Sequence, residues 1–296
     1  MLKQGLTDAV RTSFFMPSPA LAPYVSTYYL TEFALRPDEV VEDWLHPEWA
    51  NVRMNDAAAW KSGPSGQDLQ PLARMIATGP TGTATHFSVS GPARTWGIGL
   101  LPCGWLRFAD APASQLADRT EEVVGGATLG HFALLYAQVF SGPPDPPREA
   151  ALIDAFMLDL LSQRPPHDDD ARVRAAHAAL VDDSVMSVAD LADRIGMSSR
   201  SLERLSLRAF GFSPKLLLRR QRFLRSLAQF MLDPSLTWIK TLDWHYVDQA
   251  HFVRDFRRFM AMSPSEYAAV DHPVLRSAAR ARAVAAGAAV QALHQP

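Results

Sequence analysis

Hydrophobic residues in the first half of the chain form short segments separated by proline and glycine. Gly63-Pro64, Gly79-Pro80 and Gly91-Pro92 mark several of the turns. Between such turns, β-branched and aromatic residues favour strands at residues 24–33, 52–54, 85–89 and 96–108. Short strands at this spacing predict an antiparallel, β-rich N-terminal domain, either a sandwich or a barrel-like fold.

Two helical patterns follow the predicted strands. Residues 129–140 place apolar side chains on one stripe, and residues 148–161 repeat that pattern. Residues 163–170 then read Gln-Arg-Pro-Pro-His-Asp-Asp-Asp, where two prolines interrupt a helix and three acids favour exposure to water. We therefore expect a domain at residues 1–162 and a linker at residues 163–170.

Residues 187–211 carry the local signals of two short helices joined by a tight turn. Ser187 with Asp190 has the form of a capping box, and Gly196 suits the left-handed position that ends a helix. Ser198 then begins a second helix. Two short helices joined by a glycine turn predict a helix-turn-helix unit.

A second copy of this pattern lies farther along the chain. Ser213-Pro214 begins a connecting helix that runs to about residue 231. Asp248 can then cap a helix to about residue 260, and Ser263-Pro264 follows that helix as Ser213-Pro214 follows the first unit. In both copies the proline lies 16 residues after the N-cap residue, Ser198 or Asp248, which indicates an internal repeat.

The fold class predicted from these elements is α+β. A β-rich N-terminal domain precedes an all-helical domain at residues 171–270, where a connecting helix joins two helix-turn-helix units. Residues 271–296 form an Ala/Arg-rich tail in which we identify no chemistry.

Charge is distributed unevenly along the chain. Residues 1–165 contain 11 Lys and Arg against 17 Asp and Glu, whereas residues 187–270 contain 13 against 8. A local basic excess suits binding to a phosphate backbone. Cys103 is the sole cysteine, and no apolar run is long enough for a bilayer span or a signal peptide. We therefore expect a cytoplasmic protein that does not enter membranes.

The C-terminal segments resemble a known family. Gly196-Met197-Ser198-Ser199-Arg200-Ser201-Leu202-Glu203-Arg204, with Gly211-Phe212-Ser213-Pro214, is similar to the first helix-turn-helix of AraC-type (AraC/XylS family) transcriptional regulators. Residues 246–259, followed by Met262-Ser263-Pro264, resemble the second unit of that family. Residues 19–25 and 97–108 are similar to the N-terminal sensor domain of one branch of the family.

The resemblance implies that double-stranded DNA is the partner and that the second helix of each unit enters a major groove. Arginine can pair with guanine, glutamine with adenine, and glutamate with cytosine, while lysine and arginine position phosphates. The predicted DNA-binding residues are Ser199, Arg200, Glu203, Arg204, Arg208 and Lys215, together with Gln249, His251, Arg254, Arg257 and Arg258.

Two of these residues have alternative structural interpretations. Glu203 could instead pair with Arg200 or Arg208 on its own helix. His251 is adjacent to Phe252, and packing against the preceding turn is the favoured interpretation for it.

Three positions depart from the family pattern. The turn glycine of the second unit is replaced by His245, with Thr241 at the small crossing position; a register shift of one residue would bring in Trp244 or Lys240 instead. The second unit is therefore expected to be distorted. In the first unit, Ser206 stands where the family has a buried phenylalanine, and Leu207 or Phe210 is available to fill the gap.

The N-terminal half offers weaker functional signals. Trp96, Trp105, His86 and Arg107 are candidates for lining a small-molecule pocket, although core packing is the better interpretation for any single tryptophan. The histidines show no metal-ligand spacing, and no nucleophile or acid/base pattern indicates catalysis. We therefore expect no metal, no cofactor and no enzymatic activity.

The function predicted from the sequence is transcription regulation through sequence-specific DNA binding, modulated by a small effector in the N-terminal domain. A homodimer is expected, and RNA polymerase is a further candidate partner. The alternative is an anti-regulator that pairs with a related DNA-binding protein without reading DNA itself. A hidden enzyme in the N-terminal half is a third, weaker alternative.

Overall fold

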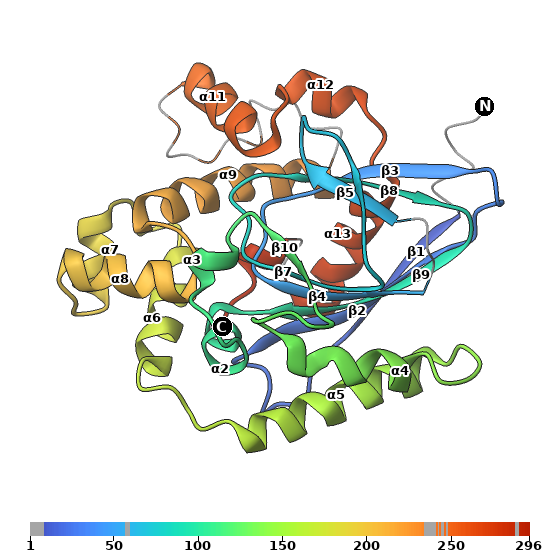
Figure 1. Ribbon diagram of the computed structural model, residues 1–296. Helices are drawn as coiled ribbons and strands as arrows, with labels where there is room; N and C mark the ends of the chain where they lie inside the picture. Colours follow the sequence, from blue (N-terminus) through green and yellow to red (C-terminus); the bar gives the residue numbers. More distant parts are fainter. Residues whose placement is uncertain are drawn as a thin grey trace.

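A computed structural model describes residues 9–56, 60–233, 241, 243, 246, 248–287 and 290–296, without the side chain of Arg280. Its N-terminal part contains two antiparallel sheets (Figure 1). The larger sheet has the order β1 (Val10–Phe15), β2 (Val25–Phe33), β9 (Ala93–Leu100), β4 (Asn51–Asn55), β7 (Met75–Thr78) and β10 (Thr120–Glu122). The smaller sheet has the order β3 (Val40–Leu45), β8 (Thr85–Ser90), β5 (Trp60–Pro64) and β6 (Gln70–Pro71).

The β-rich N-terminal half predicted from the turns is confirmed, and one predicted strand is wrong in part. Strands β2, β4 and β8 coincide with the apolar stretches at residues 24–33, 52–54 and 85–89. The stretch at residues 96–108 does not stay extended: β9 ends at Leu100, and α2 (Pro102–Phe108) follows. Pro102 occupies the first turn of that helix, where its missing N–H costs no hydrogen bond.

Helices α4 (Leu135–Val139) and α5 (Pro146–Gln163) lie along the outside of the larger sheet in Figure 1. The short α3 (Ala113–Leu116) packs against α8 (Ser199–Ala209), and η1 (Gly130–Leu134) packs against α4. The predicted helix at residues 129–140 is thus divided into a 3₁₀ turn and a short α-helix. Helix α5 includes the predicted residues 148–161, is capped by Asp145 and packs against β2.

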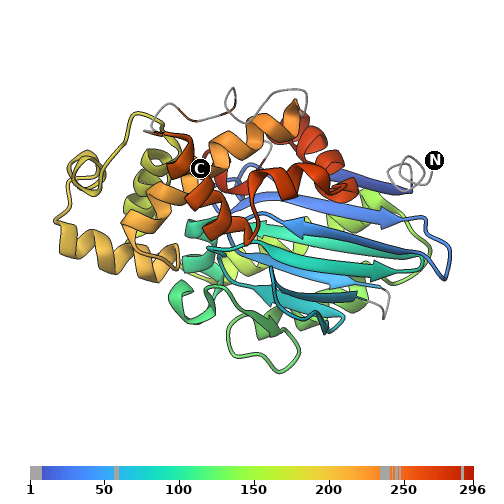
Figure 2. The same cartoon turned by 90° about the horizontal axis from the view of Figure 1, so that it is seen from above.

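The C-terminal half of the chain is helical in its described residues. The helices are α6 (Asp170–Val181), α7 (Val188–Arg194), α8 (Ser199–Ala209), α9 (Pro214–Leu232), α11 (Gln249–Met260), α12 (Pro264–Ala269), α13 (Pro273–Ala286) and η2 (Gln291–Leu293). Figures 1 and 2 show α7 and α8 at the end of the molecule away from β1.

The two halves share one hydrophobic core. Helix α8 packs against α2 and α3, and α6 packs against α2. Arg220 of α9 is fully buried between the halves: its Nη1 donates to the carbonyl oxygen of Thr81 at 2.9 Å, and its guanidinium lies 3.9 Å from the ring centroid of Trp49. Burial lowers the pKa of Arg220 to about 9. The helical domain is therefore docked firmly onto the β-rich half.

The tail at residues 271–296, for which the sequence predicted no chemistry, packs against both sheets. Helix α13 contacts β1 of the larger sheet and β3 of the smaller one, and it lies between the two sheets in Figure 1. Among the described residues, no helix combines the length and hydrophobicity needed to cross a bilayer.

Candidate functional site

The first helix-turn-helix unit consists of α7, α8 and the turn between them. Ser187 and Asp190 form the predicted capping box, in which each side chain accepts a hydrogen bond from the other residue's backbone N–H. Gly196 has φ +64°, the left-handed conformation that glycine adopts without strain. The Ser198 side chain accepts from the Ser201 N–H and starts α8. The local signals in the sequence are therefore confirmed.

The outer face of α8 carries four of the predicted DNA-binding residues. Leu202 and Leu205 are buried, and the opposite face is exposed to solvent. The first two turns of α8 expose Ser199, Arg200, Glu203 and Arg204. Among the described residues, no ion pair engages these arginines or Glu203, so the alternative pairing of Glu203 within its helix is not formed. These side chains remain available to a partner.

Arg208 differs from the other arginines of α8. Its Nη1 lies 3.4 Å from Asp169 Oδ2, and its Nη2 contacts the ring of His167. Arg208 thus holds α8 to the segment before α6. Ser206 is buried beside it, while Phe210 is fully buried and fills the gap in the core; Leu207 is exposed.

The second unit presents α11, whose predicted cap and buried stripe are both confirmed. Asp248 Oδ1 accepts a 2.6 Å hydrogen bond from the His251 N–H. The aromatic stripe is fully buried and consists of Phe252, Phe256 and Phe259. The outer face exposes Gln249, Arg254, Arg257 and Arg258.

His251 lies at the edge of this face. Its ring packs edge-on against Tyr246 with centroids 5.1 Å apart, and its Nε2 lies 4.0 Å from Asp255. Packing against the preceding segment was the interpretation that the sequence favoured. The turn substitutions at Trp244 and His245, and the alternative Lys240, lie outside the described residues; Thr241 is fully buried.

A basic concavity of about 380 Å³ lies between α9 and α11. Its lining residues are Lys215, Arg219, Arg222, His251 and Arg254. Arg219 forms an ion pair with the buried Asp255, so part of the positive charge is neutralised. Lys215 is exposed in the first turn of α9. This concavity places cationic side chains on the same side of the molecule as the outer face of α11.

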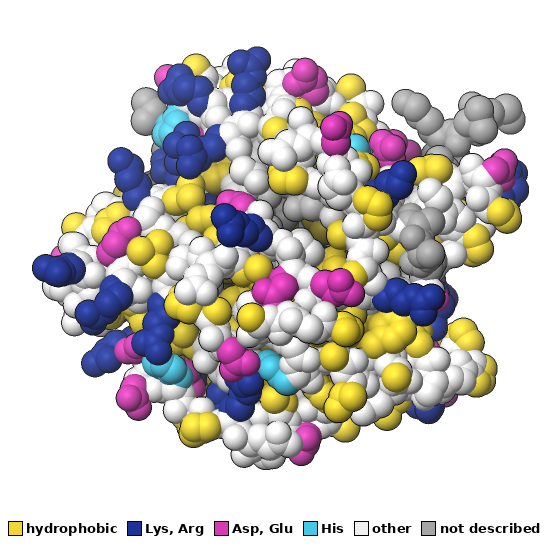
Figure 3. All heavy atoms as spheres, viewed as in Figure 1, with side chains coloured by type: hydrophobic (Ala, Val, Ile, Leu, Met, Phe, Trp, Pro, Cys, Tyr) yellow, Lys and Arg dark blue, Asp and Glu magenta, His cyan; other side chains and the backbone are white. Residues whose placement is uncertain are grey.

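Basic side chains gather along one side of the molecule. Figure 3 shows Lys and Arg over α7 and α8 and again over α11. Helix α9 packs against α7, α8 and α11 and so connects the two groups. The surface over α8, the start of α9 and α11 is the candidate nucleic-acid interface.

The four ligand candidates from the N-terminal half do not converge on one space. Trp96 Nε1 donates to Glu149 at 2.7 Å, and Trp105 Nε1 donates to the carbonyl of Ala111 at 2.8 Å. The ring of His86 stacks on Trp44 at 4.5 Å between centroids. Arg107 is buried, and its Nη2 donates to the carbonyl of Leu161. Each is engaged in packing or in hydrogen bonds.

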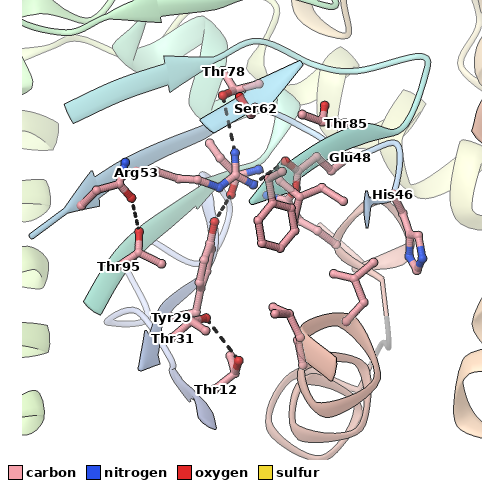
Figure 4. Close-up of a pocket in the computed structure, with 18 of the residues that line it drawn as sticks. Thr12, Tyr29, Thr31, His46, Glu48, Arg53, Ser62, Thr78, Thr85 and Thr95 are labelled. Carbon is pink, nitrogen blue, oxygen red and sulfur yellow. Dashed lines mark hydrogen bonds and ion pairs between the residues drawn. The ribbon is translucent and has the colours of Figure 1, made fainter. Parts of the chain in front are cut away.

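A different set of residues lines a cavity of about 150 Å³ between the two sheets. One end is polar: Arg53 pairs with Glu48 and donates to Thr78, and the Tyr29 hydroxyl donates to Asn51 at 3.3 Å. The other end is apolar and is lined by Phe33, Leu45, Trp60, Leu72 and Phe87. Figure 4 shows the polar side chains pointing into this space, with a C-terminal helix as one wall.

Two glycines of β9 make room for the polar end. A Cβ at Gly97 would lie 2.0 Å from Cζ of Tyr29, and a Cβ at Gly99 would lie 2.6 Å from Nε2 of Gln291. Two glycines on one face of a strand mark a close approach by other atoms, and this signal was available in the sequence. The sequence did not indicate that the tail would supply Gln291 and Arg282 to the cavity.

No cluster of three or more His, Cys, Asp or Glu side chains within the described part of the chain is arranged to hold a metal ion. Cys103 is buried, and burial raises the pKa of its thiol to about 12. It is therefore a poor nucleophile.

Comparison with known protein families gives two matches. Residues 191–269 match the helix-turn-helix domain family, and residues 13–122 match a domain of unknown function (DUF6597). No match was found among curated protein sequences.

Comparison with solved structures also gave matches. ToxT from Vibrio cholerae O395 is 10% identical, with a TM-score of 0.40 over 88% of this chain and 97% of that chain. Wild-type ToxT from Vibrio cholerae strain SCE256, bound to an unsaturated fatty acid, is 12% identical, with a TM-score of 0.43 over 86% and 96%. The AraC-like transcriptional activator CuxR is 13% identical, with a TM-score of 0.25 over 77% and 90%.

Proposed function

We propose, from the premise that residues 191–269 are an AraC-type helix-turn-helix domain, that this chain is a sequence-specific DNA-binding transcription regulator. The observation that carries the proposal is the outer face of α8, where Arg200, Glu203 and Arg204 are exposed and free of ion pairs with described residues. Charged side chains held on a rigid, capped helix without partners suit a surface that binds DNA.

Helix α8 reads base edges in one major groove. Arg200 and Arg204 can each donate two hydrogen bonds to guanine, and Glu203 can accept one from cytosine. Because both arginines lie on one face of a short helix, they address neighbouring base pairs. Arg208 is held by Asp169 and makes a smaller contribution than the other two arginines.

Helix α11 reads the next groove. Gln249 suits adenine and Arg254 suits guanine, while Arg257, Arg258 and Lys215 bind phosphates. Helix α9 packs against both units and sets the distance between them. His251 packs on Tyr246 and contributes less to base recognition than Gln249 and Arg254.

The β-rich half is a sensor domain in this proposal, and its cavity holds a small effector. The cavity is enclosed by both sheets and by α13, which directly follows the second helix-turn-helix unit. A ligand in the cavity therefore contacts a helix that is joined directly to the second DNA-binding unit. The protein acts as a homodimer in the cytoplasm, and RNA polymerase is its further partner at a promoter.

DNA binding is tested by selecting sites from randomised duplexes and measuring affinity by fluorescence anisotropy at fixed salt. The variant combines Arg200→Ala with Arg204→Ala, and a matched control combines Arg11→Ala with Arg36→Ala, two exposed arginines of the N-terminal half. We expect specific affinity to fall about a hundredfold or more in the α8 variant and to stay unchanged in the control.

Unchanged affinity in the α8 variant would contradict the assignment of the site. A wild-type protein that selects no sequence but captures a related DNA-binding protein would instead support the anti-regulator alternative.

A further inference from the structure

The tail helix α13 is joined to the β-rich half by a dedicated polar contact. Asp43 of β3 is fully buried, and its Oδ2 accepts hydrogen bonds from the N–H groups of Val274 and Leu275 at 3.0 and 2.9 Å. A carboxylate that caps a helix from another part of the chain favours one docked position, because it satisfies free N–H groups and meets the positive end of the helix dipole.

Near the other end of α13, Arg282 points into the cavity between the sheets. Its side chain is 6% exposed, and Nη1 donates to Thr27 Oγ1 at 2.8 Å. The guanidinium also lies 5.5 Å from the ring centroid of Phe14. Nε and Nη2 have no hydrogen-bond partner, and no carboxylate among the described residues pairs with this arginine.

The positions of the two free donors of Arg282 indicate which chemical group they can bind. Nε and Nη2 form one edge of the planar guanidinium, and their N–H bonds are parallel. This geometry matches the two oxygens of a carboxylate, which arginine binds in a bidentate manner. A buried cation with unsatisfied donors is costly unless a partner compensates it.

The charges that line the cavity leave one positive charge uncompensated. Glu48 pairs with Arg53, which leaves Arg282 as the cation without a counterion. His46 also lines the cavity, but burial lowers its pKa to about 3, so it is neutral near pH 7. Burial lowers the pKa of Arg282 only to about 10, and it stays charged. A monoanion would balance the site.

The apolar end of the cavity restricts the remainder of the ligand. Phe33, Trp60 and Phe87 form an aromatic wall, and Phe14 lies next to Arg282. A buried apolar cavity of about 150 Å³ is large enough for benzene. The space therefore suits a compact apolar body that carries one acidic group.

We propose that α13 completes a carboxylate-binding site in the cavity between the sheets, in which Arg282 binds the carboxylate of a small apolar acid. The proposal rests on the effector cavity of the proposed function and names its ligand class and its recognition residue. The site exists only while the tail is docked, because Arg282 and one apolar wall of the cavity belong to the tail, whereas most of the remaining lining belongs to the β-rich half.

Ligand binding at Arg282 also affects the second DNA-binding unit. α12 ends at Ala269, and α13 begins at Pro273, so the two helices are joined by three residues. His272, within this connection, donates to Asp43, and Tyr267 of α12 contacts His46 of the β-rich half at 2.7 Å. A bound acid that stabilises the docked tail therefore stabilises the present position of α12.

The experiment titrates benzoate and hexanoate into the full chain by calorimetry, with benzyl alcohol and hexanol as uncharged probes. The variants are Arg282→Gln, Arg282→Lys and the matched control Arg276→Gln, which lies on the same helix and does not line the cavity. Wild type and the control are expected to bind at least one acid about tenfold or more tightly than the matching alcohol.

Arg282→Gln should lose that preference for the acid, and Arg282→Lys should retain part of it, because lysine keeps the charge but not the two-donor edge. Thermal unfolding without ligand shows whether each variant is folded. An Arg282→Gln protein that is folded and keeps the full preference would overturn the proposal, as would a wild-type protein that binds none of the acids. Because these titrations contain no DNA, failure of DNA binding leaves their outcome unaffected, and the two proposals fail separately.

Discussion

His272 Nδ1 donates a 2.8 Å hydrogen bond to Asp43 Oδ1, although 229 positions separate the two residues in the chain. The other ring nitrogen of His272 lies 2.9 Å from the carbonyl oxygen of Tyr267. Both ring nitrogens thus lie within hydrogen-bonding distance of an oxygen atom. This contact ties the end of the DNA-binding domain to the smaller sheet of the β-rich half.

Replacing Asp43 with Asn is expected to lower the free energy of unfolding by about 2 kcal/mol. Both carboxylate oxygens of Asp43 accept hydrogen bonds, whereas the amide nitrogen of Asn cannot accept one. The amide would also turn a donor toward His272 or toward the first turn of α13. Urea denaturation measures the change. Asp38→Asn, an exposed site just before the same strand, is the control and should change little. Equal stability of both variants would show that the tail is not held by Asp43.

Arg204→Ala and Arg208→Ala should differ in DNA binding, although both residues lie on the exposed side of α8. Loss of Arg204 is expected to cost about ten- to a hundredfold in specific affinity. Loss of Arg208 is expected to cost less than about threefold, because its guanidinium is already engaged by Asp169 and His167 and is directed toward the segment before α6. Anisotropy titrations on one selected duplex compare the two variants; a larger loss for Arg208 would mean that its contact with Asp169 breaks on DNA.

Lys215→Ala tests the phosphate role of the start of α9. Lys215 is exposed beside the basic concavity, so its loss should weaken binding to all sequences equally and reduce the slope of log affinity against log salt by about 1. Lys61→Ala on β5 is the control. A change confined to one DNA sequence would assign Lys215 to base recognition instead.

Gly97→Ala tests the close contact beside the cavity. The new Cβ would lie 2.0 Å from Cζ of Tyr29, so the ring must move toward the cavity that it lines. We expect a loss of about 1–3 kcal/mol in stability, as for other overpacked cores, together with weaker benzoate binding. Gly130→Ala is the control, since its Cβ would meet only the Val123 carbonyl at 3.6 Å. Calorimetry and urea denaturation measure both effects.

Acid should destabilise the protein through two buried histidines. Burial lowers the pKa of His46 and of His177 to about 3, whereas an unfolded histidine titrates near 6.5. Below pH 6.5 the unfolded chain binds more protons than the folded one. The free energy of unfolding should therefore fall as the pH drops from about 6.5 toward about 3, by about 1.4 kcal/mol per pH unit for each histidine.

His177→Leu removes one of these two groups and should reduce that pH slope. Urea denaturation at pH 7 and pH 5 measures it, and a slope identical to that of the wild type would exclude His177 as a source. His167→Leu, at a partly buried position before α6, is the control and should leave most of the slope intact.

Much of the helix-turn-helix geometry could be predicted because its signals act over a few residues. Ser187, Ser198 and Asp248 each cap a helix through a hydrogen bond to a residue three positions ahead. Gly196 adopts the positive φ that its turn requires. Such contacts depend on residue type and spacing alone, so they can be predicted from the sequence without knowledge of the fold.

The predicted strand at residues 96–108 is wrong beyond Leu100, where the local sequence is compatible with either a strand or a helix. Apolar residues continue past Leu100, but Pro102 begins a helix that packs under α8. Gly104 of that helix lies so close to the backbone of Tyr24 that a Cβ would meet its carbonyl oxygen at 2.0 Å. Packing between distant segments selected the helix, and short apolar runs do not reveal such packing.

The sequence by itself determined the two capped units, the basic character of their outer faces and the β-rich nature of the first half. Only the tertiary structure decided that Arg208 is held by Asp169, and that the tail returns between the sheets to place Arg282 beside Phe14. The reason is physical: helix caps and periodic apolar faces are local, whereas an ion pair or a cavity wall requires two distant segments to meet. Where those segments meet depends on how the whole core packs.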